Sequence, residues 1–205
     1  FDLSAACTGF LYAMSVADAY IKAGMYKKVL VIGAEVMSQV VDWKDRSVCV
    51  LFGDGAGAVV LGEDISGKSI FRLHSDSGSA QALTLGKENA VHMNGREIFS
   101  FAVRKVPESV KEVLEESETA KEQVKYFILH QANARMIESI AKRLDVPVEK
   151  FPMNLETHGN TSAASIPVLL DELNRQNRLI PGDVLILSGF GGGLSWGSAL
   201  LEWHK

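Results

Sequence analysis

The chain has 205 residues, of which 47% are hydrophobic and 22% charged, a composition typical of a globular protein that buries a large core. The formal net charge of −4 gives no basic footprint for nucleic acid, and no stretch approaches the about 20 consecutive apolar residues of a membrane helix. We therefore expect no nucleic-acid partner, no membrane partner and a cytoplasmic location. The only two cysteines, Cys7 and Cys49, are interpreted as free thiols.

The start of the chain has the pattern of a structure already in progress. Phe1 is not an initiator methionine, and residues 1–6 have the pattern of a β-strand that runs directly into a helix. A buried parallel strand needs neighbours delivered by crossover connections. The sequence therefore indicates the C-terminal part of a longer protein. Alone, this part is expected to be insoluble or inactive because it exposes a sheet edge and apolar faces.

A strand–helix–strand unit opens the chain. Apolar residues recur at helical spacing from Phe10 to Ile21, and Gly24 is placed to end that helix. The apolar run at residues 28–35 then predicts a buried strand. This alternation favours an α/β fold.

The next segment predicts two strands and a long loop. Residues 56–61 and 69–73 are expected to be strands, antiparallel because their connection is short. Residues 75–94 are polar and aperiodic, and we interpret them as a flap. A helix is then expected over residues 106–122, with Pro107 in its first turn.

The opening design then repeats. Strand 124–129 runs into a helix that carries Met136, Ile137, Ile140, Ala141 and Leu144, and a further helix and two closing strands are expected at residues 162–174, 183–187 and 196–203. In both repeats a strand ends at a chemically useful side chain, Cys7 or His130. We therefore predict two similar halves. Residues 1–105 carry the nucleophile and the flap, residues 106–205 carry His130 and Asn160, and the ligand-binding strand ends converge.

Three side chains are candidates for chemistry. Cys7 stands at the first turn of a helix, whose positive end lowers the pKa of a thiol, although a buried structural cysteine is the alternative. Cys49 lies in an apolar run and is interpreted as a packing residue. His130 follows a strand, where a structural histidine is the alternative. Asn160 lies in a polar cluster before a helix, and capping alone explains that cluster poorly because one helix needs one cap.

Metal and nucleotide sites are not expected. The histidine nearest Asn160 has no partners at metal-ligand spacing. The glycine-rich stretches at residues 53–57 and 191–193 lead into strands, so they lack the helix N-terminus that binds a pyrophosphate. Backbone N–H groups in the second stretch are instead suited to stabilise an oxyanion.

Five motifs in order carry a family resemblance. They are ACTGF at residues 6–10, FGDGAG at 52–57, HQAN at 130–133, HGNTSAAS at 158–165 and GFGGG at 189–193. Together they resemble 3-oxoacyl-[acyl-carrier-protein] synthase III without the family's N-terminal portion. The resemblance implies a thiolase-like α-β-α-β-α layered fold of two similar halves, a homodimer, and no cofactor.

The resemblance also implies a reaction and a set of roles. Cys7 would take an acyl group from acyl-CoA, acetyl-CoA by default, and His130 and Asn160 would assist decarboxylation of malonyl-carrier protein and attack of the carbanion. The other implied roles are an oxyanion hole from the backbone of Cys7 and Gly192, timing of decarboxylation by Phe190, CoA and pantetheine binding by Arg46, Ala132 and Asn133, and acyl-carrier-protein binding by Gln131, Arg135 and Lys142. Ordinary solvated surface is the alternative for the three basic residues.

Other members of the superfamily are the rival interpretations. Polyketide synthases and hydroxymethylglutaryl-CoA synthases share the Cys-His-Asn set, and the latter need an upstream acid that this chain does not contain. A non-catalytic superfamily partner would be expected to lose its nucleophile, whereas Cys7 is present. The motifs favour the synthase III interpretation.

Overall fold

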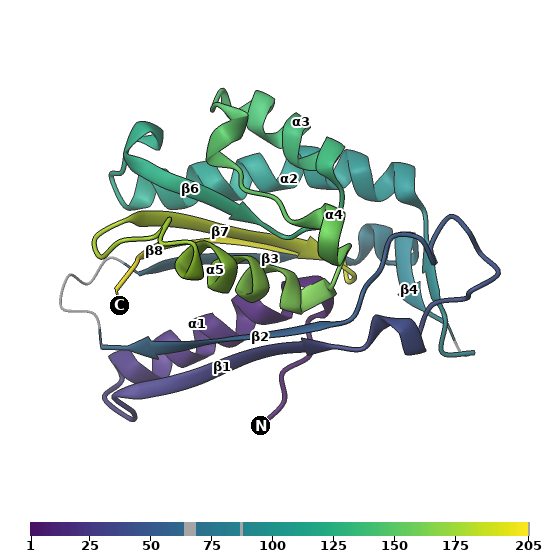
Figure 1. Cartoon of the computed structure of the whole chain (residues 1–205), viewed down its shortest axis with the longest axis horizontal. Helices are drawn as coiled ribbons and strands as arrows, with labels where there is room; N and C mark the ends of the chain where they lie inside the picture. Colours follow the sequence, from purple (N-terminus) through teal and green to yellow (C-terminus); the bar gives the residue numbers. More distant parts are fainter. Residues whose placement is uncertain (64–68, 87, 205) are drawn as a thin grey trace.

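The structure, a computed structural model, describes residues 1–63, 69–86 and 88–204, and its helices and sheets stack in layers (Figure 1). Helices α2 (Gly95–Glu116) and α3 (Ala134–Leu144) form the outer layer. Below them lie a four-stranded sheet, helices α1 (Gly9–Lys22) and α5 (Ser165–Arg175), and a two-stranded sheet. Among these described residues, no helix is long and apolar enough to cross a membrane.

The four-stranded sheet is buried on both faces. Its strand order is β3 (Ile70–Ser75), β8 (Ser195–Glu202), β7 (Val184–Gly191) and β6 (Val124–Leu129), with β6 and β7 parallel and the other pairs antiparallel. One apolar core joins this sheet to α2 and α3, and another joins it to α1, α5 and the second sheet. The end of β7 therefore reaches the middle of the molecule, beside the start of α1.

The two-stranded sheet is buried on one face only. Strands β1 (Lys28–Glu35) and β2 (Gly55–Gly62) pair antiparallel, and Gly57 lies so close to α5 that an added Cβ would come within 2.7 Å of the Val168 nitrogen. The outward-facing side chains are exposed by 60% at Leu30, 59% at Ile32 and 63% at Val60. The prediction that 28–35 is a fully buried strand was wrong, because no described element covers its outer face.

The predicted flap has regular structure. A 3-10 helix at Ser77–Ala82 leads into a hairpin of β4 (Leu83–Leu85) and β5 (Val91–Met93), with residue 87 outside the described residues. Ala82 and Val91 are buried, so the hairpin packs onto the body of the protein. The aperiodic sequence reflects strands of only three residues each, too short to show a period.

Two strand predictions were wrong. Residues 1–5 form no strand, because no described strand lies beside them to accept their hydrogen bonds. The strands predicted at 56–61 and 69–73 exist as β2 and β3, but β2 pairs with β1 and β3 pairs with β8. Strands β2 and β3 belong to different sheets, and we propose that the two halves divide after β2 and before β3 rather than at 105/106, which lies inside α2.

Helix α2 begins eleven residues before its predicted start. Asn94 caps it by accepting a hydrogen bond from the Glu97 nitrogen, and Pro107 lies in the helix interior. Proline has no N–H to donate to the Val103 carbonyl one turn earlier. Arg143 on α3 donates to that oxygen instead, with an Nη1 to oxygen distance of 3.3 Å. A neighbouring helix thus replaces the missing backbone bond, which sequence periodicity could not reveal.

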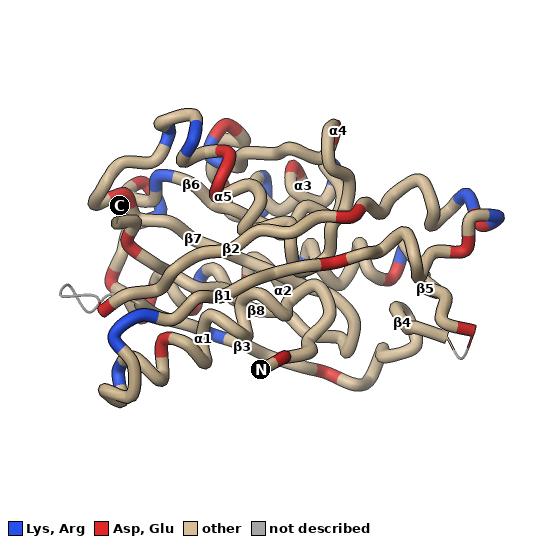
Figure 2. The backbone as a smooth tube through the Cα atoms, turned by 60° about the horizontal axis from the view of Figure 1, so that its bottom comes forward, with Lys and Arg blue, Asp and Glu red and all other residues tan. Residues whose placement is uncertain are grey.

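The remaining elements follow the predictions. Helix α1 ends near Gly24, and β6, α3 and β8 match the predicted segments, with a short helix α4 (Leu155–His158) added before Asn160. Helix α5 begins three residues after its predicted start, and β7 continues four residues beyond its predicted end, to Gly191. The predicted α/β class is confirmed. Acidic and basic residues are interspersed along the described chain (Figure 2).

Candidate active site

Cys7 is held at the junction of a 3-10 turn (Ala6–Thr8) and α1. Thr8 fixes this turn by donating from Oγ1 to the Ala5 carbonyl at 2.6 Å and by bonding Ser195 Oγ at 2.7 Å. Strand β7 passes directly behind the cysteine: an added Cβ at Gly191 would lie 2.8 Å from Cys7 Cβ. Only glycine fits there, so the GFGGG motif brings its backbone against the thiol.

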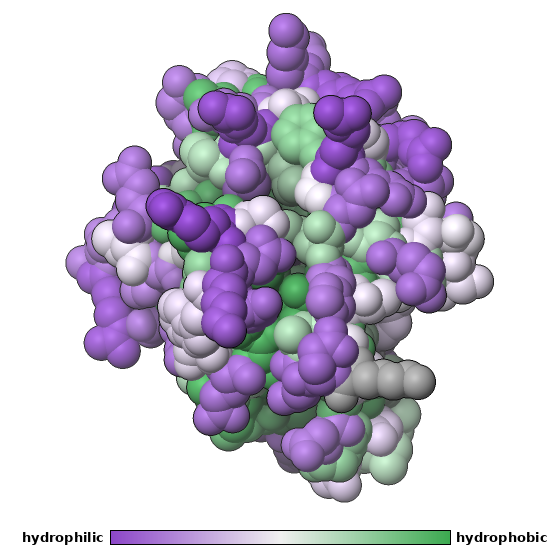
Figure 3. Space-filling model, turned by 90° about the vertical axis from the view of Figure 1, so that its right-hand side faces the viewer, coloured by the Kyte–Doolittle hydropathy of each residue, from purple (hydrophilic) through white to green (hydrophobic). Residues whose placement is uncertain are grey.

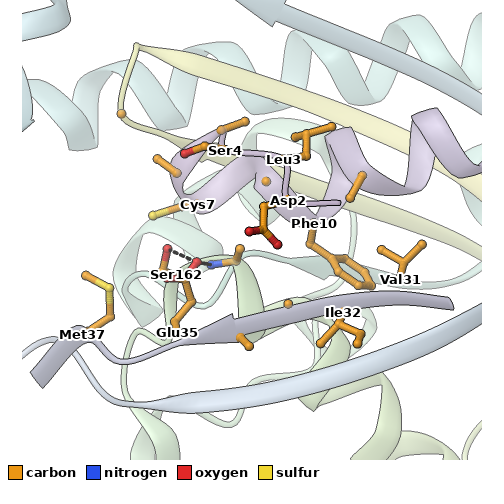
Figure 4. A pocket seen from close by; sticks show the side chains of 18 of the residues that line it. Asp2, Leu3, Ser4, Cys7, Phe10, Val31, Ile32, Glu35, Met37 and Ser162 are labelled. Carbon is orange, nitrogen blue, oxygen red and sulfur yellow. Dashed lines mark hydrogen bonds between the residues drawn. The ribbon is translucent and has the colours of Figure 1, made fainter. Parts of the chain in front are cut away.

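The Cys7 thiol faces Ser162 and Glu35 (Figure 4). Burial raises the pKa of Cys7 to about 11, a hydrogen bond with Ser162 lowers it, and the charge of Glu35 raises it further. Ser162 Oγ donates to Glu35 Oε1 at 3.2 Å, and the Ala163 nitrogen donates to the same atom at 3.4 Å. The prediction of a depressed pKa was wrong, because desolvation outweighs the helix N-terminus.

His130 is buried at the end of β6, with 1% of its surface exposed. Its Nδ1 lies 2.7 Å from Ser165 Oγ, and its ring packs edge-on against Phe190 with centroids 5.3 Å apart. Burial lowers the pKa of His130 to about 4, so the imidazole is neutral at physiological pH. Phe190, for which the resemblance implies a role in timing decarboxylation, thus contacts the histidine ring.

Asn160 is fixed by backbone bonds to the FGDGAG segment. Its nitrogen donates to the Leu51 carbonyl at 2.8 Å, and its carbonyl accepts from the Gly53 nitrogen at 3.0 Å. The side-chain Oδ1 accepts from the Ser162 nitrogen at 2.9 Å. This leaves the amide N–H₂ as the end of Asn160 suited to donate to a ligand.

Hydrogen bonds to Glu172 hold the segment before Asn160. The Glu172 carboxylate on α5 accepts from Asn154 Nδ2 at 3.0 Å and bonds His158 Nε2 at 2.5 Å. Both partners belong to the short segment around α4. His158, whose sequence signal was weak, therefore fastens this segment to α5.

One segment, residues 160–165, connects the three candidate residues. Asn160 lies on it, Ser162 lies beside Cys7, and Ser165 bonds His130. Sequence reasoning assigned no role to Ser162, Ser165 or Glu35. The excess of polar residues over what one helix cap requires was the available signal for the two serines, whereas Glu35 gave none because its partners lie more than a hundred residues away.

A cavity of about 1060 Å³ opens beside the thiol. Its described lining includes Cys7, Glu35 and Ser162 and the apolar side chains of Met37, Val40, Phe52, Leu83 and Val91, and it extends along residues 1–6 and strand β1. His130 and Asn160 are not among these described lining residues. The end-on view in Figure 3 shows hydrophobic surface running along a hollow with polar residues around it. The space next to the nucleophile therefore suits an apolar chain.

Gly192 lies close to the nucleophile turn. An added Cβ would be 3.6 Å from Ala6 Cβ and 3.5 Å from the Leu83 carbonyl oxygen. The structure thus brings together the two backbone segments predicted to form an oxyanion hole.

The predicted CoA-binding residues occupy different environments. Arg46 is exposed on the turns between β1 and β2. Ala132 is half-buried, and its nitrogen donates to the His130 carbonyl at 3.0 Å. Asn133 is half-buried and caps α3, because its Oδ1 accepts from the Arg135 nitrogen at 2.9 Å.

Of the predicted carrier-protein residues, two are exposed and one is not. Arg135 and Lys142 are seven residues apart on the exposed part of α3. Gln131 is completely buried: its Nε2 donates to the Leu129 carbonyl at 2.7 Å and its Oε1 accepts from the Asn154 nitrogen at 3.2 Å. The prediction that Gln131 binds a carrier protein was wrong, because its polar groups bridge β6 to the segment before α4.

Comparison with protein families gives two matches. The family model described as 3-Oxoacyl-[acyl-carrier-protein (ACP)] synthase III matches residues 1–93, and the model described as 3-Oxoacyl-[acyl-carrier-protein (ACP)] synthase III C terminal matches residues 114–203. Together they contain the candidate residues Cys7, His130 and Asn160.

Curated relatives and solved structures agree with these matches. Beta-ketoacyl-[acyl-carrier-protein] synthase III of Porphyra umbilicalis is 45% identical over 100% of this chain and 68% of its own length, and a Bacillus cereus synthase III is 47% identical over 100% and 66%. The Aquifex aeolicus synthase III crystal structure superposes with a TM-score of 0.96 at 46% identity, covering 99% of this chain and 67% of that one. The chain thus spans about two thirds of the length of these relatives.

Proposed function

Because the chain belongs to the 3-oxoacyl-[acyl-carrier-protein] synthase III family, an acyltransferase family that initiates fatty acid synthesis, we propose that Cys7 is its acyl-accepting nucleophile. In the first step Cys7 displaces CoA from an acyl-CoA, acetyl-CoA by default. Cys7 loses its thiol proton and forms a thioester with the acyl group. The departing CoA thiolate takes up one proton, so the step is balanced. The cavity beside the thiol supports this role, since its apolar lining suits the transferred acyl chain.

In the second step the acyl group receives a carbanion. Malonyl-carrier protein loses CO₂, the resulting enolate attacks the Cys7 thioester, and 3-oxoacyl-carrier protein leaves as the Cys7 sulfur is released. His130 and Asn160 would donate hydrogen bonds to the enolate oxygen. A neutral His130 and an Asn160 whose Oδ1 is already occupied support this assignment, because both are then donors.

Backbone N–H groups would stabilise the tetrahedral intermediates. We assign this role to the nitrogens of Cys7 and Gly192, whose segments lie in contact. Phe190 would limit access to His130, since its ring covers one edge of the imidazole. Both roles depend on the close approach that Gly191 permits.

Substrate recognition involves the surface around α3. We assign Arg135 and Lys142 to the acidic carrier protein, Arg46 to the nucleotide end of CoA, and Ala132 and Asn133 to the pantetheine arm, the last two because they flank His130 in sequence. We further propose that the protein is a cytoplasmic homodimer, as the family resemblance implies. Both cysteines are free thiols, which suits a reducing compartment. Sedimentation equilibrium at two protein concentrations tests the dimer.

The contact of Cys7 with the cavity carries the proposal, and intact-mass spectrometry of the full-length protein after incubation with acetyl-CoA tests it. One added acetyl group is expected in the wild type and in Cys49→Ala, and none in Cys7→Ala. Cys49→Ala is a matched control because it removes the other free thiol. An adduct that persists in Cys7→Ala, or no adduct with acetyl-CoA and a panel of longer acyl-CoAs, would overturn the proposal.

A further inference from the structure

The buried pair of His130 and Ser165 has a defined donor and acceptor. A neutral imidazole carries one proton, on Nδ1 or on Nε2, and the partner of one nitrogen decides which. Here Nδ1 lies 2.7 Å from Ser165 Oγ, and the serine is itself 2% exposed. No bulk water reaches this pair to exchange partners, so the hydroxyl sets the tautomer.

The backbone of Gln131 orients that hydroxyl. Its N–H donates to Ser165 Oγ at 3.2 Å, so the oxygen already accepts one hydrogen bond. In the described part of the chain, the bonds of this oxygen are those to His130 and Gln131. Were Nδ1 also a donor, the hydroxyl proton would be buried without an acceptor, at a cost of about 1–3 kcal/mol. The favourable arrangement has Ser165 donating to Nδ1.

We propose that Ser165 is a positioning residue that keeps His130 in the Nε2–H tautomer. The inference rests on the proposed function, in which His130 donates to the enolate oxygen, and it names the residue that makes this donation available. A ring with the proton on Nδ1 would present a lone pair to the enolate and repel it. Ser165 thus acts on the reaction only through His130.

Two further features agree with this role. Ser165 is the first residue of α5, so the positive end of that helix lies beside the ring and disfavours the imidazolium. The backbone N–H of His130 donates to the Ser188 carbonyl at 2.8 Å, and this bond fixes the backbone that carries the ring. The ring is therefore held neutral, oriented and in one tautomer.

The ¹⁵N spectrum of the protein labelled with [¹⁵N]histidine tests this proposal, because it reports which ring nitrogen carries the proton. The His130 signals are assigned as those absent from His130→Gln. We expect Nε2–H in the wild type and a mixture of tautomers in Ser165→Ala. Ser117→Ala is the control, a partly buried serine at the end of α2 whose Oγ donates to the Leu114 carbonyl, and it should leave the spectrum unchanged. Nδ1–H in the wild type, or an unchanged spectrum in Ser165→Ala, would overturn the proposal.

Half-reactions give the second readout. In Ser165→Ala, condensation should fall by about 10-fold, short of the ~10²–10³-fold loss of a whole oxyanion donor, while acetylation of Cys7 is retained. Equal loss of both steps would indicate a structural role and count against the proposal. Should Ser165→Ala not fold, Ser165→Cys replaces it, since a thiol is a weaker donor of similar shape. If the wild type were never acetylated, the proposed function would fail while the nitrogen spectrum still decided the tautomer.

Discussion

At the scale of single residues, the two side chains proposed as nucleophile and hydrogen-bond donor both carry no charge. Burial places the pKa of Cys7 at about 11 and that of His130 at about 4, so thiol and imidazole are both neutral at pH 7. Many cysteine nucleophiles instead rest as a thiolate beside an imidazolium. A neutral imidazole suits the proposed role of His130 as a hydrogen-bond donor, and in the proposed reaction the thiol would lose its proton during acyl transfer.

Removing the charge of Glu35 should make Cys7 more acidic. Glu35→Gln takes a negative charge away from the thiol, so the thiolate is stabilised and the pKa of Cys7 falls. Iodoacetamide labelling of Cys7 across pH, followed by peptide mass spectrometry, should show its midpoint at lower pH. Glu35→Asp keeps the charge and serves as the control. A midpoint unchanged in Glu35→Gln would show that this carboxylate does not act on the thiol.

Burial of neutral His130 should make the protein less stable in mild acid. The pKa of His130 falls from 6.5 when exposed to about 4 when folded, so the unfolded chain binds more protons between these values. Stability is therefore lost as pH falls through 6.5, on the order of 2 kcal/mol between pH 7 and pH 5 from this residue. Urea unfolding at both pH values should show this loss reduced by that amount in His130→Gln. Equal losses in the two proteins would contradict the assignment.

Motifs in the sequence pointed to Cys7, His130 and Asn160 as candidates, whereas residues whose contacts depend on distant partners were missed. Glu35 contacts residues 127 and 128 positions away, which no local pattern records. Gln131 stands in a recognised motif, yet its side-chain amide is hydrogen-bonded to backbone groups, and only the fold reveals these bonds.

At the scale of elements, the contact between α2 and α3 replaces a missing backbone bond. Arg143→Gln leaves the Val103 carbonyl without its partner and should reduce the free energy of unfolding by about 1 kcal/mol. In a Pro107→Ala background the effect should shrink, because the alanine supplies the N–H that proline lacks. Urea unfolding of the two single variants and the double variant measures this coupling. Lys142→Gln, on the neighbouring exposed position, should change stability by less than about 0.5 kcal/mol. Additive effects of Arg143→Gln and Pro107→Ala on the free energy of unfolding would contradict this explanation.

The positions of strands with a distinctive composition were predictable from the sequence, but the elements against which they pair or pack were not. The apolar runs that became β1 and β6 were located to the residue. The start of α2 was missed because Pro107 was placed in a first turn, whereas Arg143 from another helix makes an interior position tolerable. The pairing of β3 with β8 joins segments more than a hundred residues apart, so a short connection to β2 was a misleading guide.

At the scale of the whole molecule, the outer face of the β1–β2 sheet should make the 205-residue chain self-associate. Leu30, Ile32 and Val60 expose a contiguous apolar surface. Replacing all three with threonine, which retains strand propensity, should lower dye binding to hydrophobic surface and the sedimentation coefficient. Leu85→Thr is the control, since Leu85 is similarly exposed but lies on β4. A wild-type chain that sediments as a monomer and binds no dye would refute this expectation.

The segment at residues 160–165 has a consequence for redesign. Because one stretch of backbone supports Asn160 and the partners of Cys7 and His130, substitutions there should combine non-additively, and inserting a single residue should disable all three groups together. The apolar side chains beside the thiol come instead from separate elements, among them Met37, Leu83 and Val91. In the proposed reaction, acyl-chain selectivity would therefore be a modular property that laboratory evolution can alter through those positions while Cys7, His130 and Asn160 stay in place.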